Sequence, residues 1–386
     1  MSQRTTFRVQ RVPLDWRASR LRACLEQHDP SSSPVIRSLA LEVDRRSYTA
    51  TVDFRSRPLV TQSPKPWDIS LGDFGENDSS DNGYITLDDD LLGITTLYLP
   101  SDENHKAEYV IIALGSISGC PLDSFEDEAS SHVWLRDVLP AQLFDVVTRR
   151  PMARVMTYGF QSFIDRDYGP MAFEALGKVF LKNLATLGTP SDAKPTILVG
   201  HGVGGLVIKQ ALVSLSQSQK EADTNILDAI RGVIFLGVPH DGMDIASLGL
   251  APGNGGLSQQ LIESLSREGS EVLKQLHSDF MQAFAQKYEI EIFSFYETLE
   301  TTVVQQVRHL DSLKKDGSLR YGVVVSRASA THCHPCEDDS LQTCAIPRTH
   351  AGMARFEPHD PEYDAVRNRL LKLVRRATSD WAYVGS

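Results

Sequence analysis

Short apolar runs alternate with longer amphipathic segments over most of the chain, from about residue 91 onward. The runs are rich in β-branched residues and end at glycine or polar turns, which is typical of strands buried on both faces. They are Tyr109–Leu114, Arg154–Tyr158, Ile197–Val199, Ile230–Gly237, Glu291–Tyr296 and Tyr321–Ser326. Helical spacing lies between them, as at Met171–Leu187. This alternation predicts an α/β domain over residues 91–386, with a mostly parallel sheet covered by helices on both faces.

Two further segments refine this domain. Residues 243–290 contain helical patterns between two predicted strands, so we expect them to form a helical cap insertion. Tyr321–Ser326 is the last predicted strand, and Tyr363–Arg376 closes the domain with an amphipathic helix.

The N-terminal residues 1–60 follow a different pattern, because segments with strand-like alternation of apolar and polar residues lie before and after a single helical segment. Apolar and polar residues alternate in three segments, which are Phe7–Val12, Ile36–Val43 and Ser47–Phe54. The apolar residues of Leu14–Gln27 have helical spacing. Strand, helix, strand, strand predicts a small ferredoxin-like βαββ unit. Residues 61–90 then become polar, acidic and glycine-rich, which predicts a flexible linker.

An RNA-recognition domain begins in the same way as this N-terminal unit, so its stacking positions decide between two functions. They fall on Arg8, Thr49 and Thr51, none of which is aromatic. Without aromatic rings there is no platform on which bases can stack. We therefore expect a packing or docking module for a protein partner, and no nucleic acid.

The turn after Ile197–Val199 carries the clearest chemical signal. Thr196–Leu215 reads as a strand, a glycine-rich turn and a helix, which is the context of the nucleophile elbow G-x-S-x-G. The central position of that turn is Gly202. Glycine has no hydroxyl, so no acyl-enzyme can form at this position.

The composition of the chain bears on its binding partners and its cellular location. The 386 residues carry a formal net charge of −11, which argues against a nucleic-acid or anionic-membrane surface. Five cysteines, an odd number, favour a reducing compartment. The first residues have no apolar signal-peptide region, and no apolar run is long enough to span a membrane. The expected location is cytoplasmic.

Several segments, in the same order along the chain, resemble segments of one known protein family. Residues of about 91 to 376 resemble the fungal lipase/serine-esterase-like α/β-hydrolases, which occur alone and as N-terminal domains of fungal receptor-like and ankyrin-repeat proteins. The matching segments are Trp134–Pro140, Ala153–Gly159, Gly200–Ala211, Gly232–Gly242, Phe295–Thr298 and Thr349–Met353. The chain departs from the family at Gly202, where the family has serine, and at Leu114-Gly115, where the family usually has His-Gly.

The resemblance implies roles for the remaining site residues. His350 follows the last strand, where such a fold places its base, and Glu297 follows the preceding strand as the acid. Asp241 is the rival acid. The backbone N–H groups of Gly115 and Val203 are expected to form an oxyanion hole.

Other nucleophiles and a metal site are weaker alternatives. Ser116, Ser118 and Cys120 follow the oxyanion strand, and His201 borders the turn, but none of them sits on the elbow. Cys333 and Cys336 have the C-x-x-C spacing of a structural zinc site, yet Cys344 is single and the second half of the pattern is missing. We therefore expect no metal and no cofactor.

Three functional hypotheses remain open. The preferred one is a pseudo-esterase that has lost hydrolysis and acts as a binding or signalling module for a small-molecule or acyl ligand. The second is an enzyme that uses His350 and Glu297 for acid–base chemistry without a covalent intermediate, such as a lyase, condensation or cyclisation enzyme of fungal secondary metabolism. The third is an esterase inactivated by engineering at Gly202.

Overall fold

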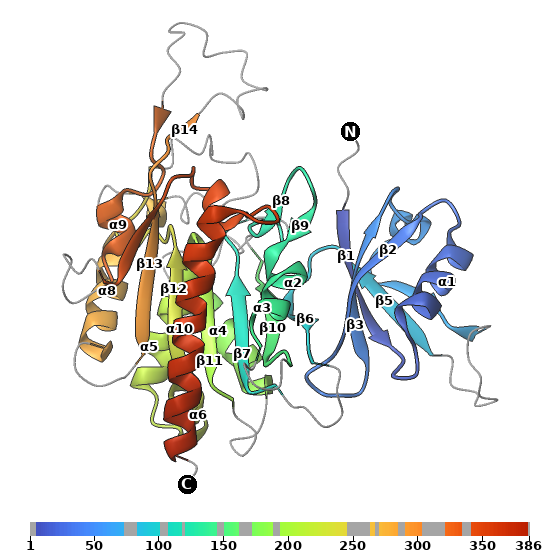
Figure 1. Ribbon diagram of the computed structural model, residues 1–386, viewed down its shortest axis with the longest axis horizontal. Helices are drawn as coiled ribbons and strands as arrows, with labels where there is room; N and C mark the ends of the chain where they lie inside the picture. The colour runs from blue at the N-terminus through green and yellow to red at the C-terminus, as the bar shows by residue number, and fades with distance from the viewer. Residues whose placement is uncertain are drawn as a thin grey trace, which may run out of the picture. The chain divides into compact units, whose positions relative to one another are not determined.

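The structure is a computed structural model that describes residues 5–72, 83–100, 107–117, 120–144, 150–161, 172–187, 194–244, 263–266, 270–284, 290–302, 321–333 and 341–384. The chain divides into two compact units. The first contains Met1–Val110 and Leu135–Gly159, and the second contains Ile111–Trp134 and Phe160–Ser386. Figure 1 shows the elements with their labels.

The first unit is built on a five-stranded antiparallel sheet in the order β2-β3-β1-β5-β4. Its elements are β1 (Thr5–Val12), α1 (Ala18–His28), β2 (Pro34–Leu41), β3 (Tyr48–Phe54), the short 3-10 helix η1 (Leu59–Gln62), β4 (Trp67–Ser70) and β5 (Tyr84–Asp88). The predicted βαββ order is present in its first four elements. Alternate residues of the strands and one face of α1 form a common apolar core that contains Phe7, Leu21, Phe54 and Trp67.

The flexible linker predicted over residues 61–90 differs from the structure. Two parts of it are strands that pair with each other, with Ile69 opposite Ile85. The side chains of Trp67, Ile69, Ile85 and Leu87 are buried, because period-two alternation places them on the core face. The acidic residues 73–82 between the two strands lie outside the described residues.

The RNA-type stacking positions of this unit are filled by its own structure. Thr49 and Thr51 are fully buried, and Arg8 is nearly so. The Arg8 guanidinium donates to Asp88 at 2.8 Å and to the Thr95 hydroxyl at 2.9 Å. This face of the sheet therefore offers no surface on which bases could stack.

The first unit also contains elements that the sequence assigns to the hydrolase domain. β6 (Gly93–Tyr98) and β10 (Ala153–Gly159) pair antiparallel, and α3 (Leu139–Gln142) precedes β10. The division between the two units therefore does not fall at residue 90. α2 (Trp134–Asp137) and β7 (Tyr109–Leu114) both span the boundary between units.

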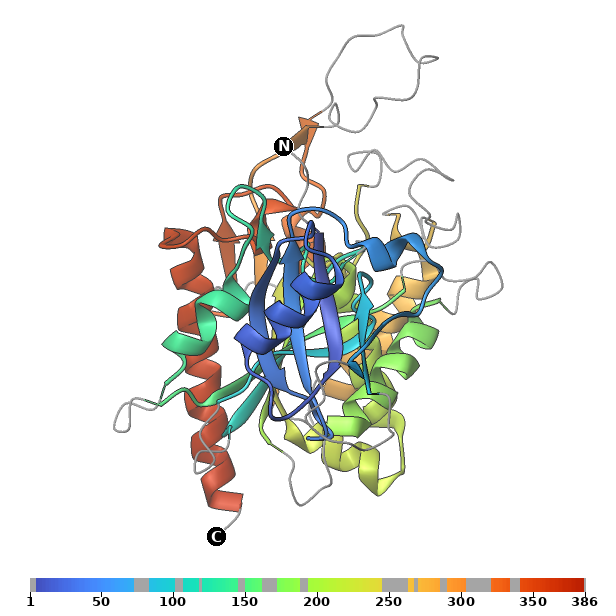
Figure 2. The same cartoon turned by 90° about the vertical axis from the view of Figure 1, so that its right-hand side faces the viewer.

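The second unit is a mostly parallel sheet whose strands follow the order β16-β13-β12-β11-β7. β11 (Thr196–His201), β12 (Ile230–Leu236), β13 (Glu291–Glu297) and β16 (Thr343–Ile346) run parallel to one another. Figure 2 shows α10 (Pro361–Val384, red) on one side of this sheet and α4 (Ala172–Leu184), α5 (Val203–Gln217) and α8 (Glu271–Phe284), green to orange, on the other. Helices therefore cover both faces, as the sequence predicts.

Shorter elements complete this unit. They are the strand pairs β8 (Glu126–Asp127) with β9 (His132–Val133) and β14 (Thr301–Thr302) with β15 (Tyr321–Gly322), and the helices η4 (Ala185–Leu187), α6 (Glu221–Ala229), α9 (Arg327–Thr331) and η8 (Gly352–Ala354). None of the helices in the described ranges combines the length and hydropathy needed to cross a bilayer.

Two sequence expectations for the second unit change. Tyr321–Ser326 is not the last strand of the sheet. Only Tyr321–Gly322 is a strand, paired antiparallel with β14, and β16 is the last strand of the large sheet. The described helix of the predicted cap, α8, packs against α5 and buries Leu273, Leu276 and Phe280, so it belongs to the helical layer. Residues 245–262 of the predicted cap lie outside the described residues.

The strand at β4 gives a direct test of the first unit. Ile69 is 3% exposed, so Ile69→Ala is expected to lower the free energy of unfolding by about 2–5 kcal/mol through lost burial and a residual cavity. Ser70→Ala, at the next and exposed position, is the matched control and should change it by less than about 0.5 kcal/mol. Chemical denaturation measures both, and equal small effects would mean that residues 67–70 form no packed strand.

Candidate active site

The turn between β11 and α5 has the backbone of a nucleophile elbow. Gly202 has φ +52° and ψ −126°, a conformation that glycine adopts without a steric penalty. Its N–H donates to the Leu236 carbonyl at 3.0 Å, and its own carbonyl accepts from the Gly205 N–H at 3.1 Å. The turn therefore has the backbone course of a nucleophile elbow, with a glycine at its centre.

The glycines beside Gly202 permit close approach of neighbouring segments. A Cβ at Gly204 would lie 2.3 Å from the Gly115 carbonyl oxygen, and one at Gly205 would lie 2.1 Å from a methyl group of Val238. A Cβ at Gly200 would lie 2.6 Å from the Gly205 Cα. The glycine pattern of the turn thus reflects packing of the elbow against the end of β7 and the segment after β12.

His350 and Glu297 form a buried hydrogen-bonded pair. β13 and β16 are neighbours with Glu297 opposite Ile346, which brings the carboxylate close to the loop after β16. His350 Nδ1 donates to Glu297 Oε2 at 2.6 Å, and the other carboxylate oxygen accepts the Val325 N–H at 3.1 Å. Both side chains are almost wholly buried. A bond of this kind fixes the tautomer of the imidazole and leaves Nε2 free for chemistry.

The loop that carries His350 is held by residues from two other strands. Gly237, after β12, has φ +56°, and a Cβ there would lie 2.6 Å from Met353 Sδ and 3.1 Å from His350 Cε1. His201, at the end of β11, donates from Nε2 to the His350 carbonyl at 3.0 Å. These contacts give physical roles to the Gly232–Gly242 and Thr349–Met353 motifs that sequence reasoning left without one.

The free imidazole nitrogen is directed at the place of the missing side chain. A Cβ built on Gly202 would lie 3.3 Å from His350 Nε2. The same point lies only 2.5 Å from Ser116 Oγ and 2.9 Å from Ser116 Cβ, so the space above the glycine is shared by these two side chains. Sequence reasoning names Ser116 but has no signal that places it there, because the contact joins two separate loops.

The other predicted site residues lie as follows. Asp241 is exposed and its backbone N–H bonds to Ser329 Oγ at 3.0 Å, whereas Glu297 is the carboxylate that contacts His350. Val203 is buried and opens helix α5, so its N–H belongs to the electropositive helix start. Gly115 follows β7, and the N–H of the next residue, Ser116, donates to Ser124 Oγ at 2.9 Å.

The sheet order, the glycine turn between β11 and α5, and the positions of Glu297 after β13 and His350 after β16 decide the fold. The second unit has the α/β-hydrolase fold. No family model matches the chain. Protein SERAC1 of Bos taurus is 31% identical over 115 residues, which is 30% of this chain and 17% of that protein, and human SERAC1 is 30% identical over the same extent. The match thus spans about a sixth of the relatives' own length.

The solved structures that resemble the chain include a phospholipase, a lipase and a thioesterase. Legionella pneumophila phospholipase PlaB in complex with thio-NAD has a TM-score of 0.38 at 14% identity, covering 58% of this chain and 44% of PlaB. Mature Bacillus licheniformis lipase BlEst2 has a TM-score of 0.39 at 14% identity, covering 71% and 97%. The thioesterase YbtT of the yersiniabactin pathway has a TM-score of 0.33 at 15% identity, covering 73% and 96%. Likenesses this distant do not bear on substrate or mechanism.

The cysteine- and histidine-rich segment shows no metal centre within the described residues, where no group of three or more His, Cys, Asp or Glu side chains could hold an ion. Cys333 is buried, and its sulfur lies 3.3 Å from Ser294 Oγ. Cys336 and Ser118 lie outside the described residues. Burial raises the pKa of the Cys120 thiol, which makes it a poor nucleophile at neutral pH.

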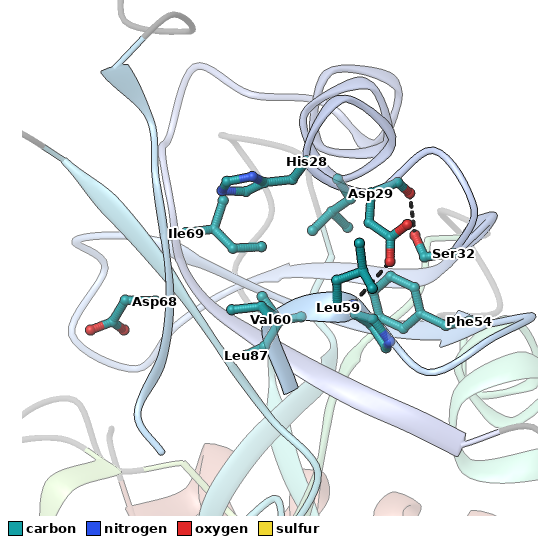
Figure 3. Close-up of a pocket in the computed structure, with 11 residues that line it drawn as sticks. His28, Asp29, Ser32, Phe54, Leu59, Val60, Asp68, Ile69 and Leu87 are labelled. Carbon is teal, nitrogen blue, oxygen red and sulfur yellow. Dashed lines mark hydrogen bonds between the residues drawn. The ribbon is translucent and has the colours of Figure 1, made fainter. Parts of the chain in front are cut away.

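A cavity of about 300 Å³ in the first unit is a separate candidate site (Figure 3). Its wall is mostly apolar, with Leu25, Phe54 and Ile69 among the lining residues. The buried Asp29 carboxylate beside it already accepts the Ser31 hydroxyl at 2.6 Å and the Leu59 N–H at 3.0 Å. This cavity can hold an apolar group but presents no reactive arrangement of side chains among its lining residues.

The burial of His201 predicts that the free energy of unfolding depends on pH in the acid range. Burial, followed by the neighbouring His350, lowers the pKa of His201 from 6.5 to about 3. Below pH 6.5 this side chain is protonated in the unfolded chain but stays neutral in the folded chain. The free energy of unfolding therefore falls as the pH falls from 6.5 to about 3. The contribution of this group is at most about 1.4 kcal/mol per pH unit.

Denaturant unfolding at several pH values measures this slope. His201→Gln, which can still donate to the His350 carbonyl, should flatten it, and the exposed His28→Gln is the matched control. An unchanged slope in His201→Gln would contradict the assignment.

The crowding above Gly202 predicts that positions 202 and 116 are energetically coupled. Gly202→Ser should destabilise the protein by about 1–3 kcal/mol from the positive φ, with a further loss from the contact with Ser116. Ser116→Gly removes that contact, so the double variant should be more stable than the sum of the single effects by about 0.5–3 kcal/mol. Strictly additive unfolding free energies would mean that the two side chains do not compete for one space.

Proposed function

We propose that the second unit is an acid–base enzyme acting on acyl or other carbonyl compounds, with His350 as the group that moves the proton and with no covalent step at residue 202. The observation that carries the proposal is the buried 2.6 Å bond between His350 and Glu297, with His350 Nε2 directed at the space above Gly202. A base held in this way is ready to take a proton from whatever occupies that space.

The chemistry of the site follows from its three parts. His350 Nε2 accepts a proton from the attacking or enolising group and returns it to the leaving group. Glu297 stabilises the imidazolium that forms in between, and remains charged throughout. The Val203 N–H at the start of α5, with the Gly115 N–H as its expected partner, would stabilise negative charge that develops on the carbonyl oxygen.

The cost of the His350–Glu297 pair favours an enzyme over an inert scaffold. Burial of a carboxylate removes it from water at a cost of several kcal/mol, which only good hydrogen bonds offset. Both Glu297 oxygens are hydrogen-bonded, and Gly237 and the His201 ring lie beside the imidazole. A pure binding module would have no need of this arrangement.

The second candidate function is a non-hydrolytic pseudo-esterase that binds an acyl ligand or takes part in signalling. Gly202 favours it, because the elbow presents no hydroxyl. The two candidates make opposite predictions for substitution of His350: turnover is lost if the site is an enzyme, and ligand binding survives if it is a binding module.

A panel of short- and long-chain acyl esters and thioesters tests the proposal with the purified full chain. His350→Ala is expected to lower turnover by about 10²–10⁴-fold, and Glu297→Gln should lower it as well, since the imidazole loses its charged partner. Asp241→Asn, at the exposed rival acid, is the matched control and should leave turnover unchanged. Turnover no higher than that of His350→Ala across the panel, with retained binding of an acyl ligand, would support the pseudo-esterase instead.

A further inference from the structure

Ser116 occupies the space that the elbow serine leaves vacant. Its Oγ lies 2.5 Å from the point where a Cβ on Gly202 would be, and His350 Nε2 lies 3.3 Å from that same point. Ser116 is half-buried. We propose that Ser116 supplies the attacking oxygen, in place of residue 202, in a serine-esterase or thioesterase reaction. This inference rests on the proposed acid–base role of His350.

Two contacts fix the backbone at Gly115 and Ser116. The Ser116 N–H donates to Ser124 Oγ at 2.9 Å. Gly115 is enclosed so tightly that a Cβ there would lie 2.8 Å from Ser124 Oγ and 3.0 Å from the Pro121 carbonyl oxygen. A nucleophile needs fixed geometry to gain from its neighbours, and these contacts supply it.

The close packing of the elbow against this loop explains why glycine is needed at position 202. The Gly115 carbonyl lies directly against Gly204, which brings the loop onto the elbow. With the loop so close, the Ser116 side chain fills the place of any larger residue at 202. The exchange of serine for glycine on the turn thus makes room for a hydroxyl that comes from the neighbouring loop.

The reaction is a two-step acyl transfer. Ser116 Oγ attacks the acyl carbon while its proton passes to His350 Nε2, and collapse of the tetrahedral intermediate expels the alcohol or thiol, which takes that proton. Water then attacks the acyl-serine, again losing a proton to His350, and the carboxylic acid leaves as Ser116 regains its hydrogen. The ester and one water give an acid and an alcohol, with no other reactant.

Three features distinguish Ser116 from other nucleophiles. Gly202 has no side chain. The raised pKa of Cys120 keeps its thiol protonated at neutral pH. Ser116 Oγ and His350 Nε2 both border the space above Gly202, at 2.5 Å and 3.3 Å from the position of a Cβ there. The ligand class is therefore an acyl ester or thioester whose carbonyl reaches the start of α5.

A fluorophosphonate probe tests the inference, because it phosphonylates only a serine activated by a base. The full chain is expected to be labelled at Ser116, located by peptide mass spectrometry. Ser116→Ala and His350→Ala should each lower the labelling rate by about 10²-fold or more. Ser130→Ala, at an exposed serine of the same unit, is the matched control and should label at the rate of the wild type.

Ser116→Cys keeps a nucleophile at the same position and guards against a simple folding defect in the alanine variant. Its new thiol is expected to react with iodoacetamide at least tenfold faster than Cys120 and to lose that advantage in the double variant with His350→Ala.

The outcomes separate this inference from the proposed function. Labelling at another serine, or turnover that depends on His350 but not on Ser116, would overturn the role of Ser116 and leave the acid–base function standing. Absence of both labelling and His350-dependent turnover would overturn the two together.

Discussion

The hydrogen bond between His350 and Glu297 is the interaction on which the organisation of the second unit depends. It joins the ends of β13 and β16, and it buries a carboxylate that would be strongly destabilising without its partners. Removal of one member of such a pair typically costs 3–5 kcal/mol. The Val325 N–H donates to the second carboxylate oxygen, and Gly237 leaves room beside the imidazole ring.

The elbow adds a second constraint, which is steric. Its glycines allow the end of β7, the turn and the segment after β12 to approach within distances that no Cβ could tolerate. In this crowded setting a serine on the turn and a serine on the neighbouring loop cannot both be present without strain. The glycine at position 202 and the position of Ser116 therefore belong to one packing arrangement.

Much of the second unit was predictable from the sequence because its signals are local. The buried strands, the glycine-rich turn and the order of elbow, acid and base lie in short motifs, and the structure brings Glu297 and His350 together as that order implies. What the sequence could not provide depends on contacts between distant segments. The strand β16 is only four residues long and carries no distinct hydrophobic pattern, and the position of Ser116 is decided by loop packing.

The first unit shows the same limit. β4 and β5 lie in polar, acidic sequence, and only their pairing with each other and with β1 makes them part of the sheet. Single-sequence periodicity is weakest for strands this short. The burial of Arg8, Thr49 and Thr51 was also beyond sequence reasoning, because it depends on partners such as Thr95, more than 80 residues away from Arg8.

The measurement that tests the account most directly is proton NMR of the full chain labelled with ¹⁵N-histidine. A short imidazole–carboxylate bond shifts the bridging proton far downfield and protects it from exchange with water. We predict one such resonance on His350 Nδ1, shifted upfield when Glu297 is replaced by Gln and perturbed by an acyl phosphonate bound above Gly202. A His350 Nδ1 proton that exchanges rapidly and does not respond to Glu297→Gln would contradict the acid–base site.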